Sequence, residues 1–188
     1  MFTLIAIILL LVSGVQAMTT DELESFRKRL EPFTQKGRFE SSFTQTRHFS
    51  AIGFDMKVQG KMLVEANKSV QWDVTSPTQS KLTLTSSYCK MWESVTNKTI
   101  TMNAKDHQWI ATIFRLQDNW FKGDLDELQK EFELNLENDH TLLMKPKTKK
   151  FENLFKSVSI EFSKRLDNIK QIRFTEKSND TLTLDFKN

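Results

Sequence analysis

A period of two residues governs the chain from Arg38 to about Met102, where large apolar side chains alternate with polar ones. Residues 70–74 have the sequence Val-Gln-Trp-Asp-Val, and residues 82–85 have the sequence Leu-Thr-Leu-Thr. Because successive side chains of a strand point to opposite faces, this alternation predicts strands with one apolar face. Short polar links such as residues 75–78 separate the runs, so we expect an antiparallel meander and not a β-α-β repeat.

Helical spacing replaces this alternation before the first strand. Four apolar residues recur at intervals of three and four, which predicts a helix that packs on the sheet: Leu23, Phe26, Leu30 and Phe33. Thr19 or Thr20 is placed to cap this helix, and Gly37 is placed to end it.

A second change of period occurs between Asp106 and Phe121, where bulky side chains form another helical stripe: Trp109, Ile110, Ile113, Phe114 and Trp120. Asp124 is expected to cap a short helix through Lys130, and five further alternating runs follow from Phe132 onward. The patterns predict an α+β, mainly β fold of about nine to eleven antiparallel strands, with one helix before them and one or two in the middle.

The N-terminus has the composition of a targeting segment. An apolar run from Phe2 to Val12 precedes Ser13-Gly-Val-Gln-Ala17, which predicts a signal peptide over residues 1–17, cleaved after Ala17. The run of about 11 residues is shorter than the ~20 that a membrane-spanning helix needs. No Lys or Arg precedes it, so an uncleaved anchor is the alternative. The remaining residues, 18–188, contain no long linker and are expected to form a single domain.

Most chemical functions lack support in this sequence. The histidines at 48, 107 and 140 lie far apart and share no ligand spacing, so we expect no metal ion and no other cofactor. We find no G-x-S-x-G elbow and no glycine-rich phosphate loop, so an enzyme is not expected. The net charge of +3 comes from basic residues scattered among 24 acidic ones, which argues against nucleic-acid binding. Cys89, the one cysteine, is expected to be a buried or half-buried structural thiol without a disulfide.

The aromatic content is the positive signal. Fifteen Phe and four Trp residues supply more bulk than one face of a single sheet needs. Core packing explains most of them, but the core of a half-barrel covered by helices is also a cavity. The sequence alone leaves two roles open, cavity lining or plain core, for five residues: Val70, Trp72, Leu82, Leu84 and Trp92.

The order of several short motifs resembles the LolA family of periplasmic lipoprotein carriers over nearly the whole chain after residue 17. The motifs, each weak alone, are Phe43-Thr-Gln45, Gly60, Gln71-Trp72, Pro77, Leu82, Trp92 and Leu142-Leu-Met-Lys-Pro146. Phe43-Thr-Gln-Thr-Arg47 and Gly123-Asp-Leu-Asp-Glu-Leu128 are more similar still to a subgroup of shorter LolA-like proteins. Some members of that subgroup belong to envelope lipid or aryl-polyene pigment pathways.

The resemblance implies an unclosed antiparallel β-barrel with a helical lid, which shields acyl chains across the periplasm. The residues expected to line its lipid cavity are Phe43, Val70, Trp72, Leu82, Leu84, Trp92, Ile113 and Phe114. The implied partners are an acylated lipoprotein or lipid as cargo, an inner-membrane ABC-type or other lipid exporter, and an outer-membrane acceptor. We expect a monomer. The alternative is a non-shuttling, lipid-sensing or assembly subunit that docks on an inner-membrane exporter.

One departure from the family concerns the lid. The best-known carrier has an Arg-Pro pair before the Trp-bearing strand, and that Arg holds the lid closed. Here Ala66 and Asn67 precede the strand of Trp72, so this contact cannot be transferred. Arg47 is the hypothesised substitute for the lid contact.

Overall fold

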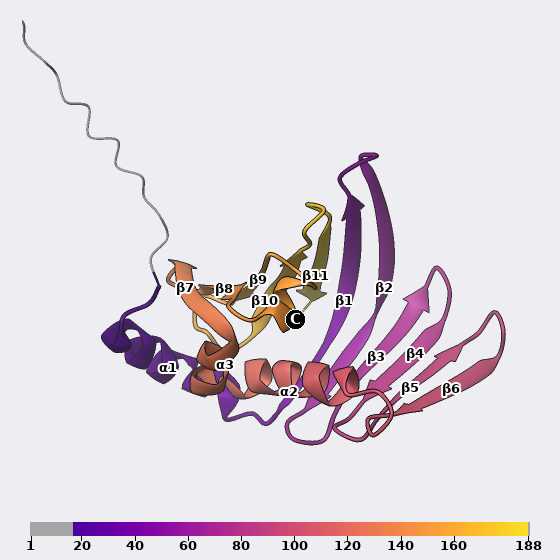
Figure 1. Cartoon of the computed structure of the whole chain (residues 1–188), viewed down its shortest axis with the longest axis horizontal. Coiled ribbons are helices and arrows are strands. Elements are labelled where there is room, and N and C mark those ends of the chain that lie inside the picture. The colour runs from indigo at the N-terminus through magenta and orange to yellow at the C-terminus, as the bar shows by residue number, and fades with distance from the viewer. Residues whose placement is uncertain (1–16, 188) are drawn as a thin grey trace, which may run out of the picture.

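The computed structural model describes residues 17–187 and contains one sheet of eleven antiparallel strands in that range (Figure 1). In chain order, the strands are β1 (Arg38–Phe49), β2 (Phe54–Glu65), β3 (Ser69–Ser76), β4 (Ser80–Leu84), β5 (Tyr88–Glu93), β6 (Lys98–Asn103), β7 (Phe132–Asn138), β8 (Thr141–Pro146), β9 (Ser157–Phe162), β10 (Ile169–Thr175) and β11 (Thr181–Lys187).

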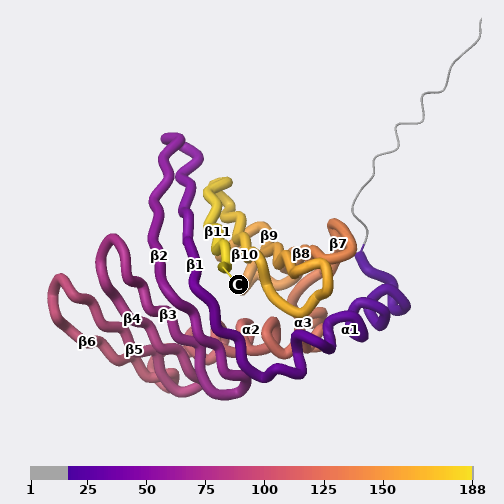
Figure 2. Tube along the Cα trace, turned by 180° about the vertical axis from the view of Figure 1, so that it is seen from behind, coloured from indigo at the N-terminus to yellow at the C-terminus, as the bar shows by residue number. Residues whose placement is uncertain are grey.

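The strand order across the sheet is β6-β5-β4-β3-β2-β1-β11-β10-β9-β8-β7. The long strand β1 pairs with β2 on one side and with β11 on the other, so it joins the two halves of the sheet. Strands β6 and β7 are the edges; the sheet curls without closing, as both views show (Figure 1, Figure 2). The expected unclosed, mainly β fold with nine to eleven antiparallel strands is therefore confirmed.

Helix α1 (Thr20–Thr34) begins as its sequence predicts. The side chain of Thr19 accepts a hydrogen bond from the Glu22 amide, and the Glu22 carboxylate accepts one from the Thr19 amide, which completes a capping box. The predicted apolar stripe is buried along its whole length, with every member at most 5% exposed: Leu23, Phe26, Leu30 and Phe33.

Three more helices lie among the described residues. Helix α2 (Trp109–Lys122) ends at Gly123, whose φ of 63° places it in the left-handed region that glycine enters without strain. Asp124 caps α3 (Leu125–Glu131) by accepting a hydrogen bond from the Glu127 amide, as predicted. The short α4 (Lys149–Glu152) was not predicted.

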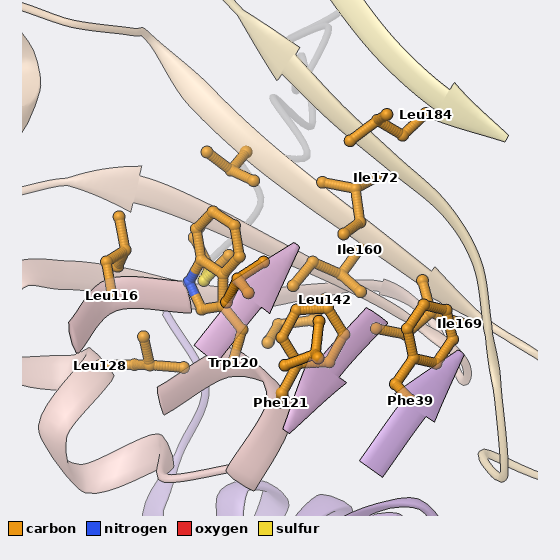
Figure 3. Close-up of a cluster of buried hydrophobic side chains, with 14 of the residues drawn as sticks. Phe39, Leu116, Trp120, Phe121, Leu128, Leu142, Ile160, Ile169, Ile172 and Leu184 are labelled. Atoms are coloured by element: carbon orange, nitrogen blue, oxygen red, sulfur yellow. The ribbon is translucent and has the colours of Figure 1, made fainter. Parts of the chain in front are cut away.

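Aromatic rings join the helices to the sheet. Phe33 of α1 packs edge-on against Phe39 of β1, with ring centroids 6.3 Å apart, and Phe39 lies 5.3 Å from the ring of Phe121 in α2. The close-up shows Trp120 and Phe121 of α2 beside apolar side chains of the C-terminal strands (Figure 3). These contacts hold α1 and α2 against one side of the sheet.

The apolar run at residues 2–12, on which the predicted signal peptide depends, lies outside the described residues. Among residues 17–187, no helix combines the length and the apolar character required to cross a membrane. Met18 donates a backbone hydrogen bond to the Leu134 carbonyl at 2.9 Å, so the start of the described chain is fastened to the edge strand β7.

Candidate functional site

The strand register gathers apolar side chains into rows on one face of the sheet. One row crosses β2 to β6 through Met62, Trp72, Leu82, Met91 and Ile100, each paired with the next. The neighbouring row runs through Val64, Val70, Leu84, Cys89 and Met102. Residues two apart in a strand share a face, so both rows lie on the same side, which we call the apolar face.

The two rows differ in how far they are covered. Val70 and Leu84 are 1% and 3% exposed, and they belong to the same core as Ile110 and Phe114 of α2, which contacts β3 and β5. Trp72, Leu82 and Met91 are only half-buried, and Ile100 at the edge is 55% exposed. We call these last four residues the open row. The apolar face therefore passes from a dry core under α2 to an open apolar surface.

The residues predicted to line a cavity divide along this boundary. The buried ones, which serve as core in this structure, are Phe43, Val70, Leu84 and Phe114. The half-buried ones are Trp72 and Leu82 of the open row and Ile113 of α2, all of which pack against the core from its accessible side.

Trp92 does not share this face, so its predicted place in the lining is wrong. It pairs with Lys81 and Thr99, whose side chains alternate with those of the open row, and its Nε1 donates to Asn97 Oδ1 at 3.3 Å. Met91 and Trp92 are adjacent large apolar residues, and only one of them can face the core. Cys89 pairs with Leu84 of the apolar face, and Met91 lies two residues after Cys89. Met91 therefore shares this face, and Trp92 points to the other side of the sheet.

Arg47 does not make the hypothesised lid contact. Its guanidinium pairs with the Glu176 carboxylate at 2.7 Å and lies over the Phe49 ring at 5.2 Å from the ring centre. Glu176 follows β10, and Phe49 ends β1, so both partners belong to the sheet and its turns. Arg47 thus fastens the end of β1 to the β10–β11 turn.

Helix α2 is held instead by a polar contact that sequence reasoning missed. The backbone amide of Asn67 donates a hydrogen bond to Asp118 Oδ1 at 2.7 Å. Lys122 Nζ donates one to Asp118 Oδ2 and one to Asn67 Oδ1, each at 3.2 Å. Asp118 is 7% exposed. Asn67 lies in the β2–β3 turn, at the segment where the family's familiar lid contact is absent, so this turn still anchors a covering helix.

One flank of α2 carries residues that follow one another at helical spacing. Trp109, Ile113, Gln117 and Trp120 are separated by three or four residues, so they share one flank of the helix. Within the predicted stripe, Trp109 is 48% exposed and Trp120 is 4% exposed. Gln117 was not singled out from the sequence because one polar residue in an apolar stripe carries no motif.

The open row consists of apolar side chains, so it offers contact with apolar groups. Across residues 17–187, no group of three or more His, Cys, Asp or Glu side chains is arranged to hold a metal ion. Hydrogen bonds from neighbouring groups lower the pKa of four carboxyls, at the start of α1, on β1 and in two turns: Glu22, Glu40, Asp167 and Asp180. All four carboxyls are at the protein surface. Burial raises the pKa of the Cys89 thiol, which favours its neutral form.

Comparisons with known proteins agree with this architecture. The family model described as "Outer membrane lipoprotein carrier protein LolA" matches residues 35–188. A search of curated proteins gives no match. An uncharacterised conserved protein from Thermus thermophilus is similar in structure with a TM-score of 0.51 and 8% identity, covering 87% of this chain and 83% of that one.

Two more solved structures are similar at lower scores. A LolA superfamily protein from Nitrosomonas europaea has a TM-score of 0.43 and 9% identity, covering 88% of this chain and 91% of that chain. A putative outer membrane lipoprotein-sorting protein domain from Vibrio parahaemolyticus has a TM-score of 0.44 and 8% identity, covering 88% and 90%.

Proposed function

This chain belongs to the LolA family of outer membrane lipoprotein carrier proteins, and from that membership we propose that its apolar face binds acyl chains of lipoproteins or related lipids. The observation that carries the proposal is the open row, where Trp72, Leu82 and Met91 remain half-buried beside a fully buried core. An accessible apolar surface of this kind can bind an apolar ligand while the protein stays folded.

The energetics of such a ligand favour a carrier without covalent chemistry. Each methylene removed from water contributes about 0.8 kcal/mol, so an acyl chain of a dozen or more carbons does not cross an aqueous compartment unaided. The open row and the flank of α2 supply apolar partners for it. Release then requires an acceptor that binds the chain more tightly, since a carrier shifts its cargo only through differential affinity.

The proposed route runs through the periplasm, from the inner to the outer membrane. The segment at residues 1–17 would direct export, and residues 18–188 would act as a monomeric carrier domain. Its partners would be an ABC-type or other lipid exporter in the inner membrane and an acceptor at the outer membrane. The proposed role is carriage and not catalysis.

Two tryptophans on opposite faces provide a matched test of ligand binding. Trp72 lies in the open row and Trp92 on the reverse face, so Trp72→Glu and Trp92→Glu introduce the same charge at different surfaces. Titration with a fluorescent naphthylamine probe should show binding by the wild type and by Trp92→Glu, with at least a tenfold loss in Trp72→Glu. No probe binding to the wild type, or equal binding by both variants, would contradict the proposal.

A transfer assay separates a shuttle from the alternative, a subunit that stays docked on an exporter. Protein loaded with a radiolabelled diacylated lipopeptide is mixed with acceptor vesicles made from outer-membrane lipids, and the label in the vesicles is counted. A shuttle moves label in proportion to the loaded protein. Stable co-purification with an inner-membrane exporter and no transfer would favour the docked subunit.

A further inference from the structure

Two polar side-chain atoms of α2 are buried without a hydrogen-bond partner. They are Oε1 of Gln117 and Nε1 of Trp120. Protein interiors rarely leave such atoms unpaired, and each exception calls for an explanation, of which a missing ligand is one. The indole N–H can only donate a hydrogen bond, and the amide oxygen can only accept one. The pair therefore offers one donor and one acceptor.

The two atoms lie on one flank of α2, the helix that covers part of the apolar face. Ile113, Gln117 and Trp120 are spaced by four and three residues, so their side chains follow one another along the same side of the helix. Ile113 is half-buried, Gln117 is half-buried with its oxygen hidden, and Trp120 is 4% exposed. The series leads from the accessible surface into the core.

Trp120 stands at the inner end of this series. Its ring packs 5.8 Å from the ring of Phe174 in β10, and the close-up shows it among aliphatic side chains, with Leu116 and Leu128 nearby (Figure 3). Phe174 itself is only half-buried. The unpaired N–H is thus surrounded by apolar groups, where a hydrogen bond to a ligand is strong because water does not compete.

A secondary amide offers the complementary pair of hydrogen-bonding groups. Its carbonyl oxygen accepts one hydrogen bond and its N–H donates one, whereas an ester offers acceptors only. We propose that Gln117 and Trp120 recognise the amide linkage of an N-acylated ligand, with the ligand carbonyl on Trp120 Nε1 and the ligand N–H on Gln117 Oε1. This inference rests on the proposed function, since it assigns the acyl chain itself to the apolar face.

Competition between two ligands of equal chain length tests the proposal. N-methyldodecanamide and methyl dodecanoate are each used to displace the fluorescent naphthylamine probe from the full-length protein. The wild type should bind the amide about tenfold more tightly than the ester, because only the amide pairs with both buried atoms. Trp120→Phe and Gln117→Met should each bring this ratio close to one while ester binding stays within about twofold.

Trp109→Phe is the matched control, because it removes an indole N–H from the same flank at a position that is 48% exposed. It should keep the wild-type ratio. A wild type without preference for the amide, or an unchanged ratio in both Trp120→Phe and Gln117→Met, would overturn the inference and leave the proposed function standing. Methyl 3-hydroxydodecanoate serves as a third ligand, an ester that carries a hydroxyl group. Tighter binding of this ester than of N-methyldodecanamide would also overturn the inference. Failure of the wild type to bind the fluorescent probe would instead remove the proposed function itself.

Discussion

The backbone amide of Asn67 donates a 2.7 Å hydrogen bond to the buried carboxylate of Asp118, which ties the β2–β3 turn to helix α2. Asn67 has a φ of 61° in the β2–β3 turn, beyond the last pair of the ladder, so its backbone amide takes no part in the sheet. Lys122 donates to both residues and closes a three-residue network. The covering helix is therefore positioned by a polar contact at its C-terminal half as well as by apolar packing.

Asp118→Ala should loosen α2. The substitution leaves the Asn67 amide without its partner in a partly buried place, so we expect a loss of about 1–3 kcal/mol in the free energy of unfolding. Urea unfolding gives the total change, and amide hydrogen exchange should show the largest loss of protection in α2.

Asp126→Ala is the control for Asp118→Ala. Asp126 forms an ion pair with Arg27 at 2.6 Å, but its side chain is 67% exposed, so its loss should cost less than about 1 kcal/mol. Equal effects of the two variants would show that the Asp118 contact does not hold the helix.

Gly60→Ala should destabilise the sheet where β2 passes β3. A Cβ at this position would stand 2.2 Å from the Asp73 carbonyl oxygen and 3.0 Å from the Phe43 ring, and the register shifts here between Gln59 and Gly60. Because the nearest atom belongs to the backbone, the strain cannot be relieved by a rotamer change, and we expect a loss of about 3 kcal/mol. The urea midpoint measures it.

Gly53→Asn is the comparison for Gly60→Ala. Gly53 has a φ of 61° in the β1–β2 turn, and a Cβ there meets nothing within 4 Å. Asn tolerates this conformation, so the free energy of unfolding should change by less than about 1 kcal/mol. Similar losses in both variants would indicate that the close approach at Gly60 is relieved by movement of the strands.

The elements that could be predicted from sequence are those whose signals are local. Thr19, Glu22 and the stripe from Leu23 to Phe33 lie within fifteen residues, and the cap, the helix and its buried face all follow from their spacing. The strands followed from the period of two for the same reason. What the apolar face binds, in contrast, depended on a resemblance to a family.

The features that could not be predicted depend on pairing between distant segments. Trp92 was placed on the wrong face because the alternation of β5 is ambiguous at Met91 and Trp92, and only the pairing with β4 resolves it. The contact of Asn67 with Asp118 joins residues 51 positions apart, and no local pattern indicates that they meet. The same holds for Gln117, whose buried oxygen is visible only once α2 is packed on the sheet.

Cys89 should resist thiol reagents in the folded protein. It is 1% exposed, and burial raises its pKa, so both access and the thiolate fraction are low. We expect reaction with a disulfide reagent at pH 8 to be roughly a hundredfold slower than in urea-unfolded protein, because it requires local opening. Lys90→Cys in a Cys89→Ala background moves the thiol to the exposed face of β5 and should react quickly. Rapid labelling of native Cys89 would contradict its place in the core.

The tip of the long β1–β2 hairpin is fastened by a carboxylate on another turn. Asp180 Oδ1 accepts hydrogen bonds from the Ser50 amide at 2.8 Å and from the Ser50 hydroxyl at 2.9 Å. These bonds favour the charged carboxylate, so the pKa of Asp180 lies below its ordinary value of 3.8 in the folded protein. A group with a lowered folded-state pKa stabilises the fold above its unfolded pKa, and this contribution is lost as the pH falls through the folded value.

The destabilisation caused by Asp180→Asn should therefore be smaller at acidic pH. The difference in unfolding free energy between the wild type and Asp180→Asn should be constant above about pH 5 and shrink as the pH falls below about 4, because protonation removes the charge that the variant already lacks. Urea unfolding at a series of pH values measures this difference. Ser50→Ala removes the hydroxyl donor and keeps the amide donor, so its pH dependence should lie between those of the wild type and Asp180→Asn. A difference that stays constant down to about pH 2 would show that the Ser50 bonds do not favour the ionised carboxylate.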